Sequence, residues 1–156
     1  MELKDFIIKE DVKRKYVLDA SAIIKWYYFE NESDLEAADY IHEKVARDEI
    51  IIVSPDLMIY EVLNFFAFKL EISAEKIDDV ITELNDIIFI INTDYSVQKK
   101  AFGLSRKIRT SIYDSMYLAL SHSLNCPLIT ADKKLKLDAQ KENCSILLLS
   151  EIKDAY

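Results

Sequence analysis

The chain has 156 residues, of which 51% are hydrophobic and 31% charged, so it is long and apolar enough to bury the core of one globular domain. Its one glycine excludes the Gly-rich phosphate loops of nucleotide-binding proteins, and its two cysteines cannot build a Cys-rich zinc site. The net charge of −8 argues against a general nucleic-acid coat, and with only two histidines we expect carboxylates to carry any enzymatic chemistry.

The first fifteen residues are predicted to form an N-terminal extension (residues 1–15), and residues 16–156 a single domain. The extension is charged and lacks the apolar core of a signal peptide. No apolar run in the chain approaches the roughly 20 residues that span a bilayer. We therefore expect a cytoplasmic protein that makes no use of a membrane.

Hydrophobic periodicity predicts helices that alternate with short strands along the domain. The strands are predicted at 16–18, 50–53, 87–91, 127–129 and 145–149. The helices are predicted at 21–29, 34–48, 55–70, 74–84, 95–108, 112–124 and 131–139, followed by a short helical tail. Ser73 is the expected N-cap of the fourth helix, and Asn92 or Thr93 that of the fifth.

This alternation predicts an α/β fold, a three-layer α/β/α sandwich around a central, mostly parallel sheet. The strands are apolar throughout, which is typical of parallel strands covered by helices on both faces. Ligands of such sheets bind beyond the C-terminal ends of the strands. Of the two histidines, His42 is expected at the surface, and His122 is expected in a surface or packing role rather than in catalysis.

Four carboxylates stand out from the acids on polar helix faces. Asp19 and Asp132 each follow a predicted strand, although either residue could simply cap the next helix. Glu61 lies in a helix that is apolar almost all round, where burial is costly without a cation, an ion pair or hydrogen bonds. Asp114 lies in the first turn of its helix, where the helix dipole alone would favour it.

Acids that converge on one sheet edge would repel one another unless a cation neutralised them. With oxygen ligands alone, the natural cation is Mg²⁺ or Mn²⁺. Such a site commonly holds phosphate oxygens and activates water. The basic residues between 99 and 109, before Asp114, and those between 133 and 136, after Asp132, suit a polyanionic substrate.

Four segments resemble, in order, the motifs of the PIN domain family. They are residues 16–26 (YVLDASAIIKW), 55–64 (PDLMIYEVLN), 113–120 (YDSMYLAL) and 127–135 (PLITADKKL). The resemblance covers about residues 16–149, and the compact size and the context of Trp26 are most similar to the VapC-type toxins of prokaryotic toxin–antitoxin pairs.

The resemblance implies a PIN-like nuclease domain that acts as a Mg²⁺-dependent endoribonuclease and hydrolyses RNA phosphodiester bonds. It implies a toxin that forms a homodimer and is silenced by a cognate antitoxin protein. Carried over by motif, the catalytic acids and ligands of Mg²⁺ (or Mn²⁺) are Asp19, Glu61, Asp114 and Asp132. The supporting residues are Ser21, Asn64 and Thr130, of which Asn64 would orient Glu61.

A non-catalytic PIN-like module that binds RNA or a protein partner is the alternative, and metal binding would separate the two. A haloacid-dehalogenase-type phosphatase is disfavoured because it requires a second acid where Ser21 stands. A receiver domain is disfavoured because it requires adjacent acids before its phosphoacceptor strand, and the chain has none there.

Overall fold

The computed structural model describes residues 13–155. Residues 1–12, most of the predicted N-terminal extension, lie outside the described part, as does Tyr156. The first strand, β1 (Arg14–Leu18), begins two residues before the predicted start of the domain.

The five strands of the described chain form one fully parallel sheet in the order β3-β2-β1-β4-β5. The strands after β1 are β2 (Ile50–Pro55), β3 (Phe89–Ile91), β4 (Leu128–Thr130) and β5 (Ile146–Leu148). Every residue of β2 is buried, as an apolar strand between two helix layers requires. The predicted α/β class is confirmed, and the sheet is parallel throughout rather than mostly parallel.

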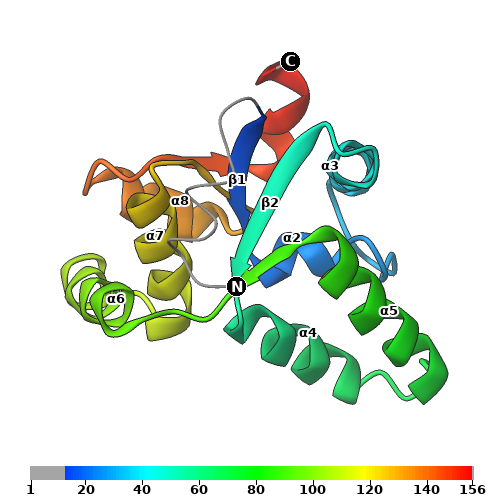
Figure 1. Cartoon of the computed structure of the whole chain (residues 1–156). Coiled ribbons are helices and arrows are strands. Elements are labelled where there is room, and N and C mark those ends of the chain that lie inside the picture. The colour runs from blue at the N-terminus through cyan, green and yellow to red at the C-terminus, as the bar shows by residue number, and fades with distance from the viewer. Residues whose placement is uncertain (1–12, 156) are drawn as a thin grey trace.

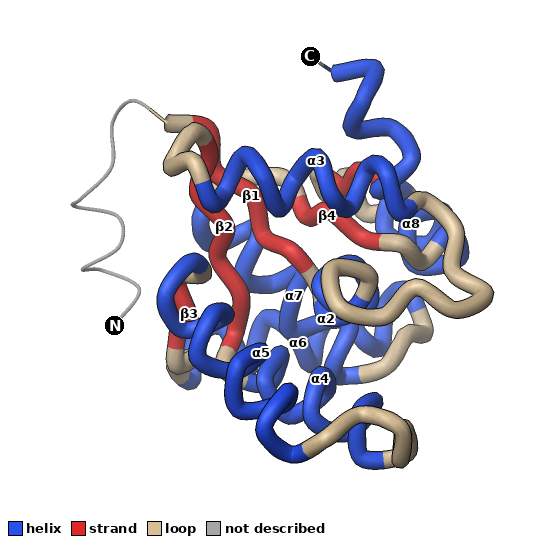
Figure 2. Tube along the Cα trace, turned by 90° about the vertical axis from the view of Figure 1, so that its right-hand side faces the viewer, coloured by secondary structure: helices blue, strands red, loops and turns tan. Residues whose placement is uncertain are grey.

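Helices cover both faces of the sheet (Figure 1). On one side lie α2 (Ala20–Ile24), α3 (Leu35–Ala46), α4 (Leu57–Ala67) and α5 (Ala74–Ile87). On the other lie α6 (Tyr95–Ile108), α7 (Ile112–Leu124) and α8 (Lys133–Gln140). Figure 2 looks onto the first layer, with β3, β2, β1 and β4 in order from left to right. A 3₁₀ helix, η1 (Leu149–Ala155), follows β5 and is the predicted helical tail.

Side-chain caps explain where several helices begin. Ser73 accepts a hydrogen bond from the Lys76 amide, which confirms the predicted cap of α5. The cap of α6 is Asp94, which accepts from the Val97 amide, so the prediction of Asn92 or Thr93 was wrong. A cap must directly precede the first helical residue for its side chain to reach the third amide, and only Asp94 stands there.

Helix α2 ends at Ile24 and does not extend to Phe29 as predicted. The chain leaves the helix where Trp26 turns into the core, at 5% exposure, and donates its indole N–H to the Ala38 carbonyl of α3 at 3.0 Å. This tertiary contact overrides the local helical pattern. The imidazole of His42, which was expected at the surface, is half-buried: it stacks on Trp26 at 4.7 Å and lies 2.9 Å from the Glu83 carboxylate. His122 is exposed.

The C-terminal ends of β1 and β2 are fastened together by a buried hydroxyl. Ser54 has no exposed surface, and its Oγ donates to the Leu18 carbonyl at 2.6 Å, one residue before Asp19. The next residue, Pro55, was predicted to open a helix but ends β2, where it lies in register with Ile91. A proline is tolerated at a strand end because little of the hydrogen-bond ladder follows it.

The two helix layers carry opposite charge. The segment that forms α2 to α5 and β2 (residues 20–87) has sixteen acidic and five basic residues. The segment that forms α6 to α8 and β4 (residues 95–141) has nine basic and only three acidic residues. The overall charge of −8 therefore conceals a basic layer packed against one face of the sheet. Among the described residues, no helix is long and apolar enough to cross a membrane.

Two fully buried serines allow a matched test of the β1–β2 fastening. Ser54→Ala removes the bond to Leu18 and should lower the free energy of unfolding by about 1–2 kcal/mol. Ser115 is equally buried, but its Oγ has no partner among the described residues, so Ser115→Ala should leave stability unchanged or raise it. Urea unfolding of both variants is the measurement, and an equal loss in both would contradict the assigned role of Ser54.

Candidate active site

The candidate site lies at the C-terminal edge of the sheet, where the strand order changes direction. The chain continues from β1 towards β2 and β3 on one side, and β4 and β5 later fill the other side. The crevice at such a switch point is the usual ligand site of a parallel α/β sheet. Asp19 follows β1 directly, and Asp132 follows β4 by two residues.

Three neighbours from two elements, α2 and β4, donate hydrogen bonds to the Asp19 carboxylate. Its Oδ1 accepts hydrogen bonds from the Ser21 hydroxyl and from the Ala22 amide, the latter at 3.1 Å, and its Oδ2 accepts from the Thr130 hydroxyl of β4. The bond to Ala22 makes Asp19 the N-cap of α2, so the capping alternative holds as well. Ser21 in turn accepts from the Ala131 amide at 3.3 Å. Both predicted supporting hydroxyls therefore orient this carboxylate.

Burial of Asp19 changes its acidity. The side chain is 6% exposed, and burial raises the pKa of its carboxyl from 3.8 to about 6, despite the hydrogen bonds from Ser21, Thr130 and Ala22 that favour the charged form. The negative charge of Asp114 adds a smaller upward shift. At neutral pH the protein therefore holds a buried, poorly compensated negative charge at the end of β1.

Glu61 projects from the middle of α4 and is half-buried, as its apolar surroundings predicted. The Tyr117 hydroxyl of α7 donates a hydrogen bond to its Oε2. Burial raises the pKa of Glu61, the bond from Tyr117 partly offsets this, and the charges of Asp19 and Asp114 raise the pKa further. The predicted alternative, an ion pair with a lysine or arginine, is absent among the described residues.

Asp114 lies in the first turn of α7, whose N-cap is Ser111. The Ser111 side chain accepts from the Asp114 amide at 3.0 Å, which places the carboxylate at the start of the helix. The Thr110 hydroxyl donates to its Oδ2 at 3.1 Å. The turn between α6 and α7 thus fixes Asp114 without any glycine.

Asp132 stands at the rim of the site. Its Oδ1 accepts from the Leu135 amide at 3.0 Å and caps α8, as the alternative interpretation held. Its own amide donates to the Thr130 hydroxyl, which also bonds Asp19. Its side chain is exposed, whereas the Asp19 carboxylate is buried and Glu61 is half-buried.

The structure thus brings three acids, Asp19, Glu61 and Asp114, within electrostatic range of one another, with Asp132 beside them. We call these four residues the acid cluster. Asn64 lines the same cleft as Glu61 but, within the described chain, makes no hydrogen bond to it. Tyr117 takes that role instead. From the sequence, Tyr117 was seen only as an apolar position of its helix. Its spacing of three residues from Asp114 puts both side chains on the same face of α7, and this was the signal that could have placed it near the site.

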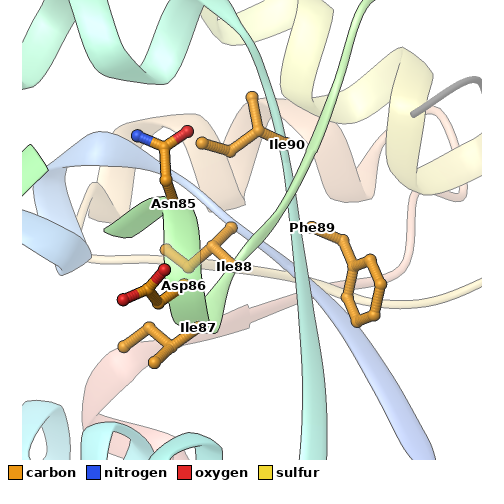
Figure 3. Close-up of a pocket in the computed structure, with 6 residues that line it drawn as sticks. All are labelled: Asn85, Asp86, Ile87, Ile88, Phe89 and Ile90. Atoms are coloured by element: carbon orange, nitrogen blue, oxygen red, sulfur yellow. The ribbon is translucent and has the colours of Figure 1, made fainter. Parts of the chain in front are cut away.

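A cleft of about 740 Å³ opens beside the acid cluster and is lined mainly by apolar and aromatic groups. The lining residues are Ala20, Ser21, Ile24, Leu57, Tyr60, Glu61, Asn64, Phe65 and Tyr113. Figure 3 shows a different cavity of about 270 Å³, formed by residues 85–90 where α5 runs into β3. Asp86 is the one acid among those six residues, so that cavity lacks the convergent polar groups of the cleft.

The chemistry of the cluster fits a hard divalent cation. Its donors are carboxylate and hydroxyl oxygens. The charge of Asp114 raises the pKa of Asp19, and the charges of Asp19 and Asp114 raise that of Glu61, as like charges do. Within residues 13–155 no three acidic, histidine or cysteine side chains make up a group that could hold a metal ion. Mg²⁺ does not require one, because it keeps several waters and usually binds through one or two carboxylates and the substrate phosphates.

Asp19→Asn should stabilise the metal-free protein in a pH-dependent way. The folded pKa of about 6 exceeds the unfolded value of 3.8, so the unfolded chain ionises first as pH rises. The destabilisation by Asp19 therefore grows between these two values and reaches about 3 kcal/mol at neutral pH. In urea unfolding with EDTA, the variant should be more stable at pH 7 and equal to the parent at pH 4. Asp86→Asn, which changes an exposed acid, should show no such trend, and a pH-independent effect at Asp19 would refute the explanation.

Tyr117→Phe should remove the hydrogen bond that restrains the Glu61 carboxylate. Burial raises the pKa of the Tyr117 hydroxyl far above its usual range, so it remains a neutral donor. Without this donor, the pKa of Glu61 should rise further and stability should fall by about 1–3 kcal/mol. Carboxyl NMR titration and urea unfolding measure both effects, with the highly exposed Tyr95→Phe as control. An unchanged pKa of Glu61 would show that the bond is not formed in solution.

The fold is shared with several solved structures. PAE2754 from Pyrobaculum aerophilum superposes with a TM-score of 0.65 at 15% identity, over 89% of this chain and 92% of that one. A toxin–antitoxin complex from Klebsiella pneumoniae gives a TM-score of 0.60 at 15% identity, over 76% and 88%. VapC20 from Mycobacterium tuberculosis, a toxin that cleaves the sarcin–ricin loop, gives 0.62 at 10% identity, over 78% and 93%.

These identities establish likeness of fold alone. No curated protein matches the chain in sequence. The sequence pattern of the PIN domain matches residues 16–139, a span that runs from β1 into α8 and contains all four residues of the acid cluster. The chain is therefore a member of the PIN domain family.

Proposed function

We propose that this PIN domain is a Mg²⁺-dependent endoribonuclease and the toxin of a toxin–antitoxin pair. The observation that carries the proposal is the convergence of Asp19, Glu61 and Asp114 from separate elements on one sheet edge. None of the ion pairs within the described chain involves these acids. Three carboxylates of like charge, without a basic partner, lower the stability of the folded protein, and a bound cation would offset this loss.

The proposed ligands of Mg²⁺ or Mn²⁺ are Asp19 and Asp114, with Glu61 and Asp132 acting directly or through water. When bound, the ion would neutralise the carboxylates, bind the scissile phosphate and supply an activated water. The chain's own residues hold the geometry. Thr130 and Ser21 fix the plane of the Asp19 carboxylate, and Tyr117 restrains Glu61.

Two further features concern the other acids, Asp114 and Asp132. The Thr110 bond to Asp114 holds that carboxylate at the start of α7, and the exposed rim position leaves Asp132 open to a water or a substrate oxygen. Hydroxyl and phenol donors suit this role because they orient a carboxylate without neutralising it.

The toxin assignment extends what is seen in the fold relatives. VapC20 is a toxin that cleaves the sarcin–ricin loop, and the Klebsiella structure is a toxin–antitoxin complex. By this analogy, the partners of the chain would be an RNA substrate, a cognate antitoxin protein and a second copy of itself, with residues 16–156 as the nuclease domain.

The alternative is a PIN-like module that binds RNA or protein without cleaving. Its acid cluster would have no use for a metal. Calorimetry with Mn²⁺ separates the two: binding that is lost in Asp114→Asn supports the nuclease, and no binding supports the non-catalytic module.

RNA cleavage is the direct test. With Mg²⁺ or Mn²⁺ the protein should cut a mixed RNA pool, EDTA should stop the reaction, and Asp114→Asn should reduce the rate about 100-fold or more. Asp86→Asn is the matched control, because it changes an exposed acid outside the cluster and should leave the rate unchanged. Cleavage that survives in both EDTA and Asp114→Asn would overturn the proposal.

A further inference from the structure

The basic helix layer contains a cavity next to the acid cluster. Its volume is about 300 Å³, and it lies between the end of α6 and α8. Its lining residues are Lys107, Ile108, Arg109, Lys134, Asp138, Lys141 and Glu142. Four cations against two acids leave an excess of positive charge on a protein whose net charge is −8. The cavity is therefore a local anion-attracting surface.

The lining acids neutralise only part of this charge. The Asp138 carboxylate lies 2.6 Å from the Lys134 ammonium and 3.2 Å from that of Lys141, and Lys107 is 3.9 Å from Glu142. Arg109 enters none of the ion pairs within the described chain. Its guanidinium is exposed and free to form the paired hydrogen bonds that phosphate oxygens accept.

The backbone at Arg109 gives a second, independent indication. Arg109 has a left-handed conformation, with φ of 53° and ψ of 47°, at the C-cap of α6. The other described residues with positive φ are all asparagine or aspartate: Asn31, Asp34, Asp48, Asn125 and Asn143. An arginine in this conformation costs about 1 kcal/mol relative to residues that tolerate it. The backbone conformation at position 109 would therefore favour asparagine or aspartate over the arginine that is present.

The cavity and the acid cluster are connected through the α6–α7 turn. Arg109 precedes Thr110, whose hydroxyl bonds Asp114. On the α8 side, Lys134 lies in the first turn of the helix that Asp132 caps, two residues after that acid. An RNA strand with one phosphate at the cluster could therefore lay a neighbouring phosphate in this cavity.

We propose that Arg109, supported by Lys107, Lys134 and Lys141, forms a phosphate-binding subsite for the RNA strand beside the acid cluster. The inference rests on the proposed nuclease function and adds the path that the strand takes, over the basic layer and away from the acidic one. It assigns to Arg109 a substrate-binding role and no part in the chemical step.

Arg109→Asn is the decisive variant, because asparagine is well suited to the left-handed conformation. Its thermal stability should equal or exceed that of the parent. Its affinity for a single-stranded RNA of about 12 nucleotides, measured by fluorescence anisotropy with Ca²⁺ in place of Mg²⁺, should fall about five-fold. The slope of log affinity against log salt should become less steep by about 0.7 for the lost phosphate contact.

The control is Arg47→Asn, which removes an exposed arginine at the C-cap of α3 in the acidic layer. It should leave RNA affinity and salt slope unchanged. Arg109→Lys keeps the charge but loses the planar fork, so its affinity should lie between those of the parent and Arg109→Asn.

The outcomes separate this inference from the proposed function. If the parent cleaves RNA but Arg109→Asn binds it as tightly as the parent, the subsite is refuted and the nuclease stands. If the parent binds RNA with Arg109 dependence but does not cleave with Mg²⁺ or Mn²⁺, the subsite is supported and the nuclease fails. If the parent does not bind RNA, the subsite is refuted outright.

Discussion

A carboxylate buried at the end of the central strand is the constraint on which the site depends. Asp19 caps α2 and receives a hydroxyl from β4, so one side chain links the strand before it, the helix after it and a strand more than a hundred residues away. Its burial opposes ionisation, and its hydrogen bonds only partly compensate. The fold therefore carries a destabilising charge at the point where the chain crosses from strand to helix. Such a cost is typical of groups arranged for binding or chemistry rather than for stability.

Much of the architecture could be predicted from the sequence, because it depends on local pattern. Uninterrupted apolar runs such as 50–53 identify buried parallel strands, and the spacing of apolar residues locates most helices. The placement of Asp19 and Asp132 after strands follows from the same reasoning. These features need no knowledge of which segments meet in space.

What the sequence could not predict depends on contacts between distant segments. The early end of α2 follows from the bond of Trp26 to Ala38, and the half-buried position of His42 from stacking on that indole. The same holds for Tyr117: its place on α7 was evident, but its bond to Glu61 requires α4 and α7 to be packed across the sheet edge. Asn64 lies one turn after Glu61 on the same helix and was therefore expected to orient it. The bond comes instead from Tyr117 on α7, because the spacing of residues along α4 does not reveal which side chains of another helix lie opposite.

The opposite charges of the helix layers give the site an asymmetric setting. Glu61 belongs to the acidic layer, whereas Asp114 and Asp132 belong to the basic one, so the acid cluster lies on the boundary between them. A polyanion approaching this edge is repelled by one side and attracted by the other. Its orientation is then set before it makes any specific contact, which is the usual effect of a charge gradient across a binding site.

The separation of 111 residues between Asp19 and Thr130 also bears on how the protein is made. During synthesis, β1 can pair with β2 early, but its other edge stays open until β4 has left the ribosome. Until then Asp19 lacks the Thr130 hydroxyl, and Asp132, which follows β4, is not yet beside it. A growing chain therefore completes its acid cluster only when β4 joins the sheet beside β1.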